Sequence, residues 1–477
     1  MRSAEKAYKN TMNQEKQEVN LLRKLGLFDS TMIIVGIVIG SGIFLTTGII
    51  AKSIPSPTLI LLAWLVGGLL SLAGALVYAE LGAAMPQAGG QYVYLREAYG
   101  PLSGFLFGWM MFLVYQTGSI AALAVAFAEY FGYFFPGLAT TKFFFSTTIT
   151  IFHHSFPYSL SMGQLVALVI IILLSILNYI GLTLGSIIQN ISTILKIGTL
   201  VAIIAFGFIL GKGGHIEYSI ASPGFSLSKL LMGFGVAMIA VIFTYDGWNN
   251  VNFAAGEIKN PGRNLPLSLI FGTLGITALY VVVNYVYLYA LPLNQLVGVV
   301  RVAEKAATAL FGGIAPSLIS AAVVISTFGA LNGTIFTGPR VYYAMAKDKL
   351  FFKRVADVHP HFRTPGFSIF TQAVWACLLT LTGTFEQIFT YVTFAALIFY
   401  IAGAASIFTL RKKFPDLPRP YKSWGYPWVP VIFIVAITVL LINTLINKPV
   451  ESLAGLGIVA LGLPAYYYWM RKGPKNP

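Results

Sequence analysis

About twelve apolar stretches, each long enough to cross a lipid bilayer as a helix, follow one another along this chain. Of its 477 residues, 57% are hydrophobic and only 10% are charged, which is more apolar surface than a soluble domain can bury. We therefore expect an all-α membrane protein. The predicted spans lie near 29–50, 57–84, 102–134, 164–184, 187–210, 228–256, 266–291, 314–346, 367–383, 386–410, 428–446 and 450–470.

The basic residues predict the orientation of these spans. A formal charge of +15 would fit a nucleic-acid-binding protein, but the lysines and arginines lie mostly in short segments between apolar stretches. Clusters at 347–354 and 411–413 fall on the same side of the membrane as the basic N-terminal tail. Because cytoplasmic loops carry the excess of positive charge, both termini are predicted to be cytoplasmic, in a plasma membrane. The expected surroundings are lipid, without nucleic acid.

One membrane domain with short tails is expected. The predicted parts are a cytosolic tail at 1–28, a core at 29–410, two further helices within 411–470 and a cytosolic tail at 471–477. The first tail lacks the apolar segment of a signal peptide. The single cysteine, Cys377, lies inside a predicted helix, which excludes an intrachain disulfide and argues against a disulfide to a partner.

The first apolar stretch is interrupted at its centre by Ile39-Gly40-Ser41-Gly42-Ile43-Phe44. Each glycine weakens a helix by about 1 kcal/mol relative to alanine. Backbone groups freed by a break are tolerated at membrane depth where they line a cavity or meet a ligand. The N-terminus of a half-helix favours an anion, so this break is a candidate carboxylate site. Alternatively, Gly36 and Gly40 serve close helix packing.

The sixth stretch contains a similar interruption, Phe243-Thr244-Tyr245-Asp246-Gly247-Trp248, about 205 residues further on. Interrupted helices at matching positions of two halves point to a binding site at the bilayer midplane. Carbonyl groups freed here would face a cation. A ligand with a carboxylate at one break and an ammonium at the other is an α-amino acid. Asp246 is either a ligand or a cap for the second half-helix.

Lys196 lies about nine residues into the fifth span, roughly 14 Å deep. A lysine near the bilayer centre costs at least about 2.5–3.5 kcal/mol unless it faces the protein interior. We expect an internal partner and a functional role, rather than an ammonium that reaches back to the interface. Tyr280 and Asn332 are further polar positions that fit either helix–helix hydrogen bonds or ligands. His153 and His154 have no acid or cysteine at ligand spacing, so neither a metal nor a cofactor is predicted.

Taken together, these motifs resemble the amino acid–polyamine–organocation (APC) superfamily, and within it the L-type amino acid transporters, especially the bacterial alanine–serine–cysteine and serine/threonine exchangers. The resemblance covers nearly the whole chain. The matching segments are Gly40-Ser41-Gly42-Ile43-Phe44, the series Gly181, Gly185, Gln189, Thr193 and Lys196, Tyr245-Asp246-Gly247-Trp248, the segment from Glu257 to Pro266, Asn332-Gly333 with Pro339-Arg340, Phe362-Arg363-Thr364-Pro365 and Trp424-Gly425-Tyr426-Pro427.

This resemblance implies a five-plus-five inverted-repeat fold with helices 1 and 6 broken, the repeats lying at 29–210 and 226–410. It implies substrate contacts around the two breaks and sodium-independent exchange. Lys196 would replace a sodium ion and bridge to the first span and to Tyr280, while Asp246, Trp248 and Asn332 would influence gating or selectivity. The implied substrate-binding residues are Gly40, Ser41, Gly42, Ile43, Phe243, Thr244, Tyr245 and Gly247. A disulfide-linked heavy chain is not expected, and Asp246 leaves open some tolerance for cationic substrates.

The leading hypothesis is an alternating-access exchanger of small or medium neutral L-amino acids such as alanine, serine, threonine and cysteine. A proton-coupled symporter, in which Lys196 loses its proton, is the alternative carrier. A membrane-embedded enzyme would need a convergent catalytic pair, and Glu80, Glu129, Lys196 and Asp246 form none that is recognisable. An ion channel would need charge rings or a repeated filter sequence, which the sequence does not contain.

Overall fold

The computed structural model describes residues 21–472 except 55, 152–153, 210–213, 215, 217–226 and 383–384. Within these residues, nine helices are long and apolar enough to cross a membrane, and the bent pair α2 (Leu27–Val38) and α3 (Gly42–Ser53) forms a tenth span. Two shorter apolar helices, Met232–Thr244 and Gly366–Leu381, lie at the predicted sixth and ninth spans. The predicted succession of membrane helices is confirmed.

The first half of the chain contains most of the long spans. After α2 and α3 come α4 (Pro57–Ala84), α5 (Gln91–Tyr99), α6 (Pro101–Met110), the π-helical turn η1 (Met111–Tyr115), α7 (Gln116–Phe134), the 3₁₀ turn η2 (Pro136–Leu138), β1 (Phe143–Ile151), β2 (His154–Ser161), α8 (Met162–Ile180) and α9 (Leu182–Ile209). Prolines at the first helical turn begin α4 and α6, where their missing N–H is not needed.

The second half begins with α10 (Leu227–Thr244), after which the chain turns into the 3₁₀ helix η3 (Asn250–Glu257). It continues through α11 (Pro261–Ala290), α12 (Leu293–Leu296), α13 (Val302–Phe311), α14 (Ala315–Thr337), α15 (Pro339–Lys347), η4 (Lys353–Ala356), α16 (Gly366–Leu381), α17 (Phe385–Lys413), α18 (Trp428–Asn447), α19 (Pro449–Ala460) and α20 (Gly462–Lys472).

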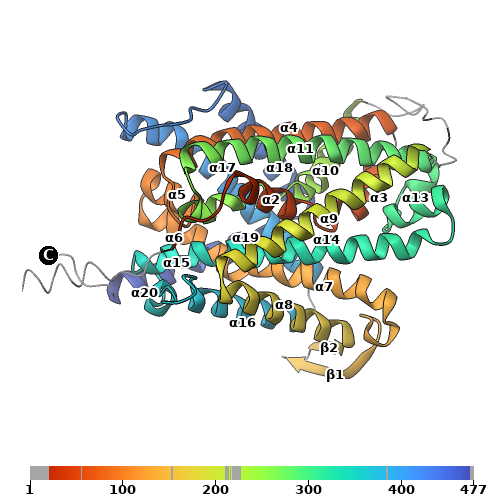
Figure 1. Ribbon diagram of the computed structural model, residues 1–477, viewed down its shortest axis with the longest axis horizontal. Helices are drawn as coiled ribbons and strands as arrows, with labels where there is room; N and C mark the ends of the chain where they lie inside the picture. Colours follow the sequence, from red (N-terminus) through yellow and green to blue (C-terminus); the bar gives the residue numbers. More distant parts are fainter. Residues whose placement is uncertain are drawn as a thin grey trace, which may run out of the picture.

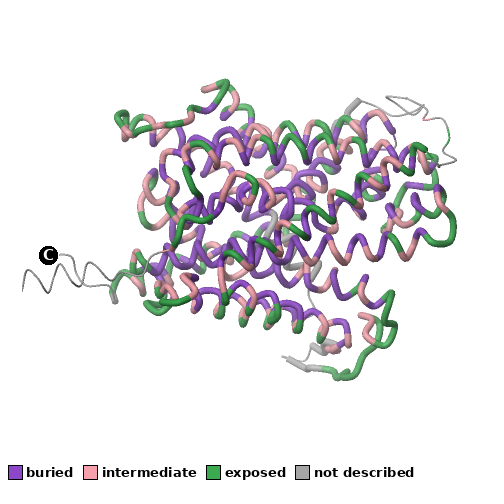
Figure 2. The backbone as a smooth tube through the Cα atoms, in the orientation of Figure 1, coloured by how far each residue is buried: buried purple, intermediate pink, exposed green. Residues whose placement is uncertain are grey.

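The two broken spans lie in the middle of the bundle. Figure 1 shows α2, α3 and α10 between a layer that contains α4 and α11 and a layer that contains α7 and α14. The core residues cluster around this centre, while green and pink segments line the outside (Figure 2). Exposed side chains on the long helices are largely apolar, as expected where lipid replaces water.

A two-stranded antiparallel sheet is an addition that the sequence analysis did not anticipate. Strands β1 and β2 pair from Phe143 with Ser161 to Ile151 with His154, with a register irregularity between Phe143 and Phe145. The hairpin connects α7 to α8, and its second strand begins at His154. His153 lies outside the described residues, and the protein is mostly rather than wholly helical.

Candidate functional site

The first break separates α2 from α3 by a bend of 44° at Ile39-Gly40-Ser41. At this bend the carbonyl groups that end α2 and the N–H groups that begin α3 have no partners within a continuous helix. The carbonyl groups accept hydrogen bonds from side chains, whereas the N–H groups have no side-chain cap. This difference defines the candidate site.

Lys196 of α9 donates to the carbonyl-bearing end of α2. Its Nζ lies 2.5 Å from Gly36 O and 2.8 Å from Ile39 O, and the residue is only 2% exposed. No carboxylate lies within ion-pair distance of this ammonium among the residues that the structure describes. The positive charge is therefore held by carbonyl dipoles at the negative end of a half-helix, which is the favourable end for a cation.

Two further side chains complete this set of hydrogen bonds. Tyr280 of α11 donates its hydroxyl to Val38 O at 2.8 Å, and Ser326 of α14 lies 2.9 Å from Ile39 O and 3.0 Å from Gly40 O. Lys196 and Tyr280 thus contact the first span separately, on neighbouring carbonyls. Lys196, Tyr280 and Ser326 fix the end of α2 from three different helices.

The N–H-bearing end of α3 is left open by contrast. Ser41 is the N-cap residue, but its side chain makes no capping hydrogen bond. Phe44 N–H donates to Ser41 O at 3.1 Å. The N–H groups of Gly42 and Ile43 lie in the first turn of α3, where the helix provides no carbonyl acceptor. Ser41 and Gly42 are also partly exposed, between fully buried neighbours. These N–H groups can therefore receive an anion.

The second break lies directly against the first. Helix α10 ends at Thr244, and a Cβ atom added to Gly42 would lie 2.8 Å from Thr244 Cγ2. Gly247 has a φ of +98°, and a Cβ there would lie 2.5 Å from Ile37 Cγ2 of α2. The hydroxyls of Thr46 and Thr244 are 3.1 Å apart. Glycine is needed at Gly247 both for its backbone conformation and for this close approach.

Carbonyl groups at the end of α10 are partly engaged. Phe243 O accepts the N–H of Asp246 at 3.0 Å, and Thr244 O accepts a long hydrogen bond of 3.4 Å from the Tyr280 hydroxyl. Each carbonyl oxygen has a second lone pair. Because Phe243 is partly exposed, this end offers an ammonium group acceptors close to the open end of α3.

Asp246 belongs to a cluster of tyrosines that the sequence analysis missed. Its carboxylate accepts hydrogen bonds from the hydroxyls of Tyr115 and Tyr400 and from the N–H of Gly247. Tyr115 ends the π-helical turn η1, and such turns redirect side chains within a helix. Asp246 thus accepts two hydroxyl groups and one backbone N–H group at the break.

Four other predicted site residues, Ile43, Tyr245, Trp248 and Asn332, pack against or hydrogen-bond to other helices of the protein. Ile43 is buried, and Tyr245 donates to Trp64 O at 3.0 Å. Trp248 stacks on Tyr400 with ring centroids 5.7 Å apart. The amide of Asn332 lies 2.9 Å from Gln189 Oε1 and 3.1 Å from Gly185 O, and its oxygen accepts from Asn178 at 2.9 Å. Asn332 therefore joins α14 to α9 and α8.

The glycines of the first break differ in what they contact. A Cβ on Gly36 would lie 2.0 Å from Gln189 Nε2, whereas one on Gly40 would lie 3.6 Å from Leu123, its nearest neighbour. Close packing therefore explains Gly36 but not Gly40. At Gly42, the contact is with the other broken span.

We expect Gly42→Ala to reduce substrate affinity and Gly40→Ala to leave it nearly unchanged. Overpacking against Thr244 costs about 1–3 kcal/mol, or roughly a tenfold weaker affinity near the middle of that range. Substrate binding to the purified variants, measured by thermal shift, compares the two. Equal effects of both substitutions would contradict the assigned contact.

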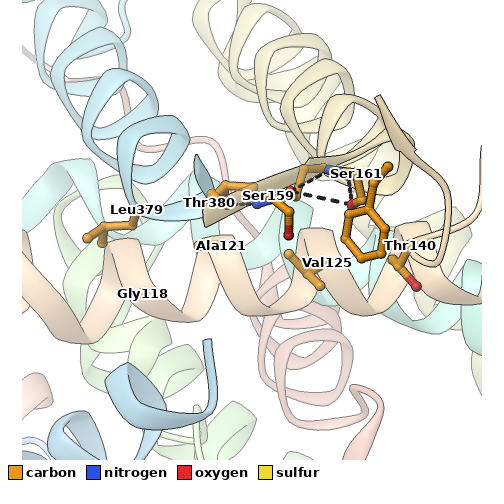
Figure 3. Close-up of a pocket in the computed structure, with 10 residues that line it drawn as sticks. Gly118, Ala121, Val125, Thr140, Ser159, Ser161, Leu379 and Thr380 are labelled. Carbon is orange, nitrogen blue, oxygen red and sulfur yellow. Dashed lines mark hydrogen bonds between the residues drawn. The ribbon is translucent and has the colours of Figure 1, made fainter. Parts of the chain in front are cut away.

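A separate cavity of about 210 Å³ lies beneath the hairpin (Figure 3). Its lining comes from α7, α8, α16 and the hairpin region and carries no charged residue among Gly118, Ala121, Val125, Thr140, Phe143, Ser159, Ser161, Gln164, Leu379 and Thr380. None of the residues at the two breaks lines it. Within the described part of the chain, no group of three or more His, Cys, Asp or Glu residues could hold a metal ion.

A buried ion pair follows the second break. Glu257, the last residue of η3, accepts Arg340 Nε at 2.7 Å and Nη2 at 3.0 Å, with both side chains almost fully buried. The carbonyl of Glu257 also accepts the N–H groups of Lys24 and Leu25 at 2.9 and 3.0 Å. These contacts join η3 to α15 and to the segment before α2; α15 lies on the side of the C-terminus in Figure 1.

Comparisons with known proteins show the family of this chain. The profile of the amino acid permease family matches residues 25–461. The chain is 34% identical to the serine/threonine exchanger SteT of Bacillus subtilis, over 94% of this chain and 98% of that protein. It is 30% identical to the human large neutral amino acids transporter small subunit 2 (95% and 82% covered) and 29% identical to the human b(0,+)-type amino acid transporter 1 (97% and 91% covered). With its first span broken beside the end of α10 and a family match over nearly its whole length, this chain belongs to the amino acid permeases of the APC superfamily, a family of membrane transporters and not of enzymes.

Proposed function

We propose that this transporter is a sodium-independent exchanger of small and medium neutral L-amino acids, in the plasma membrane with both termini cytoplasmic. The observation that carries the proposal is the pair of opposed helix ends, one with open N–H groups at Ser41–Ile43 and one with carbonyls at Phe243–Tyr245. In an amino acid the carboxylate and the ammonium are attached to the same carbon. Adjacent helix ends of opposite polarity therefore match a zwitterion without any charged side chain.

Sodium independence rests on Lys196. A sodium ion requires several oxygen ligands, and the carbonyl oxygens of Gly36 and Ile39 already accept hydrogen bonds from the Lys196 ammonium. A fixed positive charge at this position supplies what a bound cation would supply, and it also repels a second cation. Transport then needs no sodium ion to hold α2 in place.

Exchange follows if the empty carrier changes orientation slowly. Bound substrate would join α3 to the end of α10, so that the two broken spans move together between the outward- and inward-facing states. Without substrate, the N–H groups at the start of α3 have no acceptor within the helix, and the carbonyls at the end of α10 keep their hydrogen bonds to Asp246 and Tyr280. The names of the serine/threonine and large-neutral relatives favour neutral side chains. The hydrogen bonds of Asp246 to Tyr115 and Tyr400 also favour them, because this carboxylate already has partners.

The test is uptake of labelled serine into proteoliposomes loaded with unlabelled serine or alanine, with and without sodium. We expect internal amino acid to accelerate uptake several-fold and sodium to have no effect. A sodium requirement, or uptake that is indifferent to internal amino acid, would contradict the proposal. A proton gradient that drives uptake into empty vesicles would instead support the symporter. Competition by external lysine and arginine measures how far Asp246 admits cationic substrates.

No disulfide-linked partner is proposed. Cys377 lies within the transmembrane helix α16 and is half-buried, so it is poorly placed for a disulfide to an exterior domain. We expect the purified chain, expressed alone, to exchange amino acids in these vesicles. Activity that required a second polypeptide would contradict this expectation.

A further inference from the structure

Six aromatic side chains are exposed where α7 leads into the hairpin. We call them the aromatic collar; its members are Tyr133, Phe134 and Phe135 at the end of α7 and Phe143, Phe144 and Phe145 at the start of β1. Each is between 41% and 59% exposed. Lys142, also exposed, lies directly before the second group. So many large rings in contact with water would be unfavourable, since an aromatic side chain has about 150–250 Å² to bury.

The backbone of the hairpin explains why three successive rings remain uncovered. Successive side chains of a strand normally point to opposite faces, so one face can be packed while the other is exposed. Here the register shifts between Phe143 and Phe145, and Phe143, Phe144 and Phe145 are all exposed. Phe143 lines the cavity beneath the hairpin, yet about half of each of these three side chains is exposed. The exposed parts of these rings therefore require an apolar surrounding medium in place of water.

The position of the hairpin identifies that medium. In Figure 1 the hairpin lies at the lower right, at the periphery of the bundle and away from the C-terminus, beside the ends of α7 and α8. Helix α8, which follows β2 directly, carries exposed apolar side chains at helical spacing, namely Leu165, Val169, Ile172 and Ile176. That stripe belongs to the lipid-facing surface of the bundle. The aromatic collar thus continues the lipid-facing surface past the end of the helices.

The cavity beneath the hairpin has the mixed polarity of the headgroup region. Thr140 and Ser159 contribute hydroxyls to its lining, and Val125 and Leu379 contribute apolar surface (Figure 3). At the opposite end of the bundle, exposed aromatic residues also gather, namely Trp424, Trp428, Tyr467 and Tyr468. Aromatic residues are enriched at both membrane–water interfaces, whereas the hydrocarbon core is lined by aliphatic ones.

We propose that the hairpin lies in the lipid headgroup layer, with the aromatic collar inserted at the boundary between headgroups and acyl chains and Lys142 at the level of the phosphates. The collar and hairpin would then anchor α7 and α8 to the membrane, while the broken spans move. With the orientation proposed above, this layer belongs to the outer leaflet. The chemistry of the partner is that of a phospholipid interface and does not depend on the transported substrate.

The depth of the hairpin can be measured with a fluorescent label. Cys377 is the only cysteine in the sequence, so Cys377→Ala gives a background for single-cysteine variants that retain exchange activity. The test variants are Phe144→Cys and, on the other part of the collar, Phe134→Cys. Val169→Cys on α8 is the control for lipid contact. Ala309→Cys, exposed on α13, is the control for water contact.

Each labelled variant is reconstituted in vesicles and quenched by iodide in water or by lipids with a nitroxide near the headgroup or deep in the acyl chain. We expect both collar labels to be quenched several-fold more by the headgroup nitroxide than by the deep one, and several-fold less by iodide than the Ala309 label. Iodide quenching equal to that of the Ala309 label would overturn the proposal. Protection from all three quenchers would also overturn it, because a second copy or another protein would then cover the collar.

Discussion

Replacing Lys196 with methionine should nearly abolish exchange while the protein still folds. Methionine has a similar length and can occupy the same space, but it cannot donate to Gly36 O and Ile39 O. A hydrogen bond with one charged partner contributes about 1.5–3 kcal/mol, so the expected loss of transport is roughly 10- to 100-fold. Ser326 continues to donate to Ile39 O, whereas Gly36 O loses its donor from α9. The end of α2 is then no longer fixed to α9.

A matched control is Lys305→Met. Lys305 also donates to a backbone carbonyl, at 2.6 Å from Gln295 O, but it is exposed and lies away from the breaks. Its replacement should leave exchange close to that of the unmodified protein. Proteoliposome uptake of both variants, together with their melting temperatures in detergent, separates a transport defect from misfolding. Normal exchange by Lys196→Met would remove the role assigned to this ammonium.

Glu257→Gln should destabilise the protein strongly. Breaking a buried ion pair costs about 3–5 kcal/mol, because the remaining Arg340 guanidinium stays buried without its counter-charge. Glutamine can accept one hydrogen bond from Arg340 but carries no charge. We expect a lower melting temperature and, because the pair joins η3 to α15, a larger share of molecules in which these two elements separate. Thermal unfolding and cysteine accessibility near Leu25 measure the two effects.

Glu129→Gln is the matched control for this substitution. Glu129 pairs with Arg301 at 3.1 Å, but both side chains are more than two-fifths exposed, and exposed pairs contribute only about 0–1 kcal/mol. A second variant, Glu257→Met with Arg340→Met, removes both charges and should recover much of the lost stability. Equal melting temperatures for Glu257→Gln and Glu129→Gln would contradict the stabilising role assigned to the buried pair.

Several site residues could be predicted from the sequence because the bilayer penalises them in isolation. A lysine at the depth of Lys196 needs an internal partner whatever the fold, and its contacts with the first span confirm that expectation. The breaks could be predicted because glycine, serine and aspartate interrupt otherwise apolar stretches. The helix bend and the end of α10 lie where these residues predicted them.

Other features depend on tertiary contacts that the sequence does not reveal. Tyr115 and Tyr400 are far from Asp246 in the chain, and the π-helical turn that places Tyr115 has no sequence pattern of its own. The three hydrogen bonds by which Asn332 joins α14 to α8 and α9 could not be predicted from the sequence either, and its role in gating stays a prediction. A sequence pattern that indicates the first strand of the hairpin was present, because the run from Phe143 to Ile151 is rich in aromatic and β-branched residues.

The most direct measurement is an experimental structure of the protein with serine or alanine bound. The proposed function requires the substrate carboxylate to lie within hydrogen-bonding distance of the N–H groups at Ser41, Gly42 and Ile43. The substrate ammonium should lie against the carbonyls of Phe243, Thr244 or Tyr245, with Lys196 still bound to the end of α2. Substrate density elsewhere, or a sodium ion in place of the Lys196 ammonium, would contradict the central claim that two facing helix breaks hold one zwitterion.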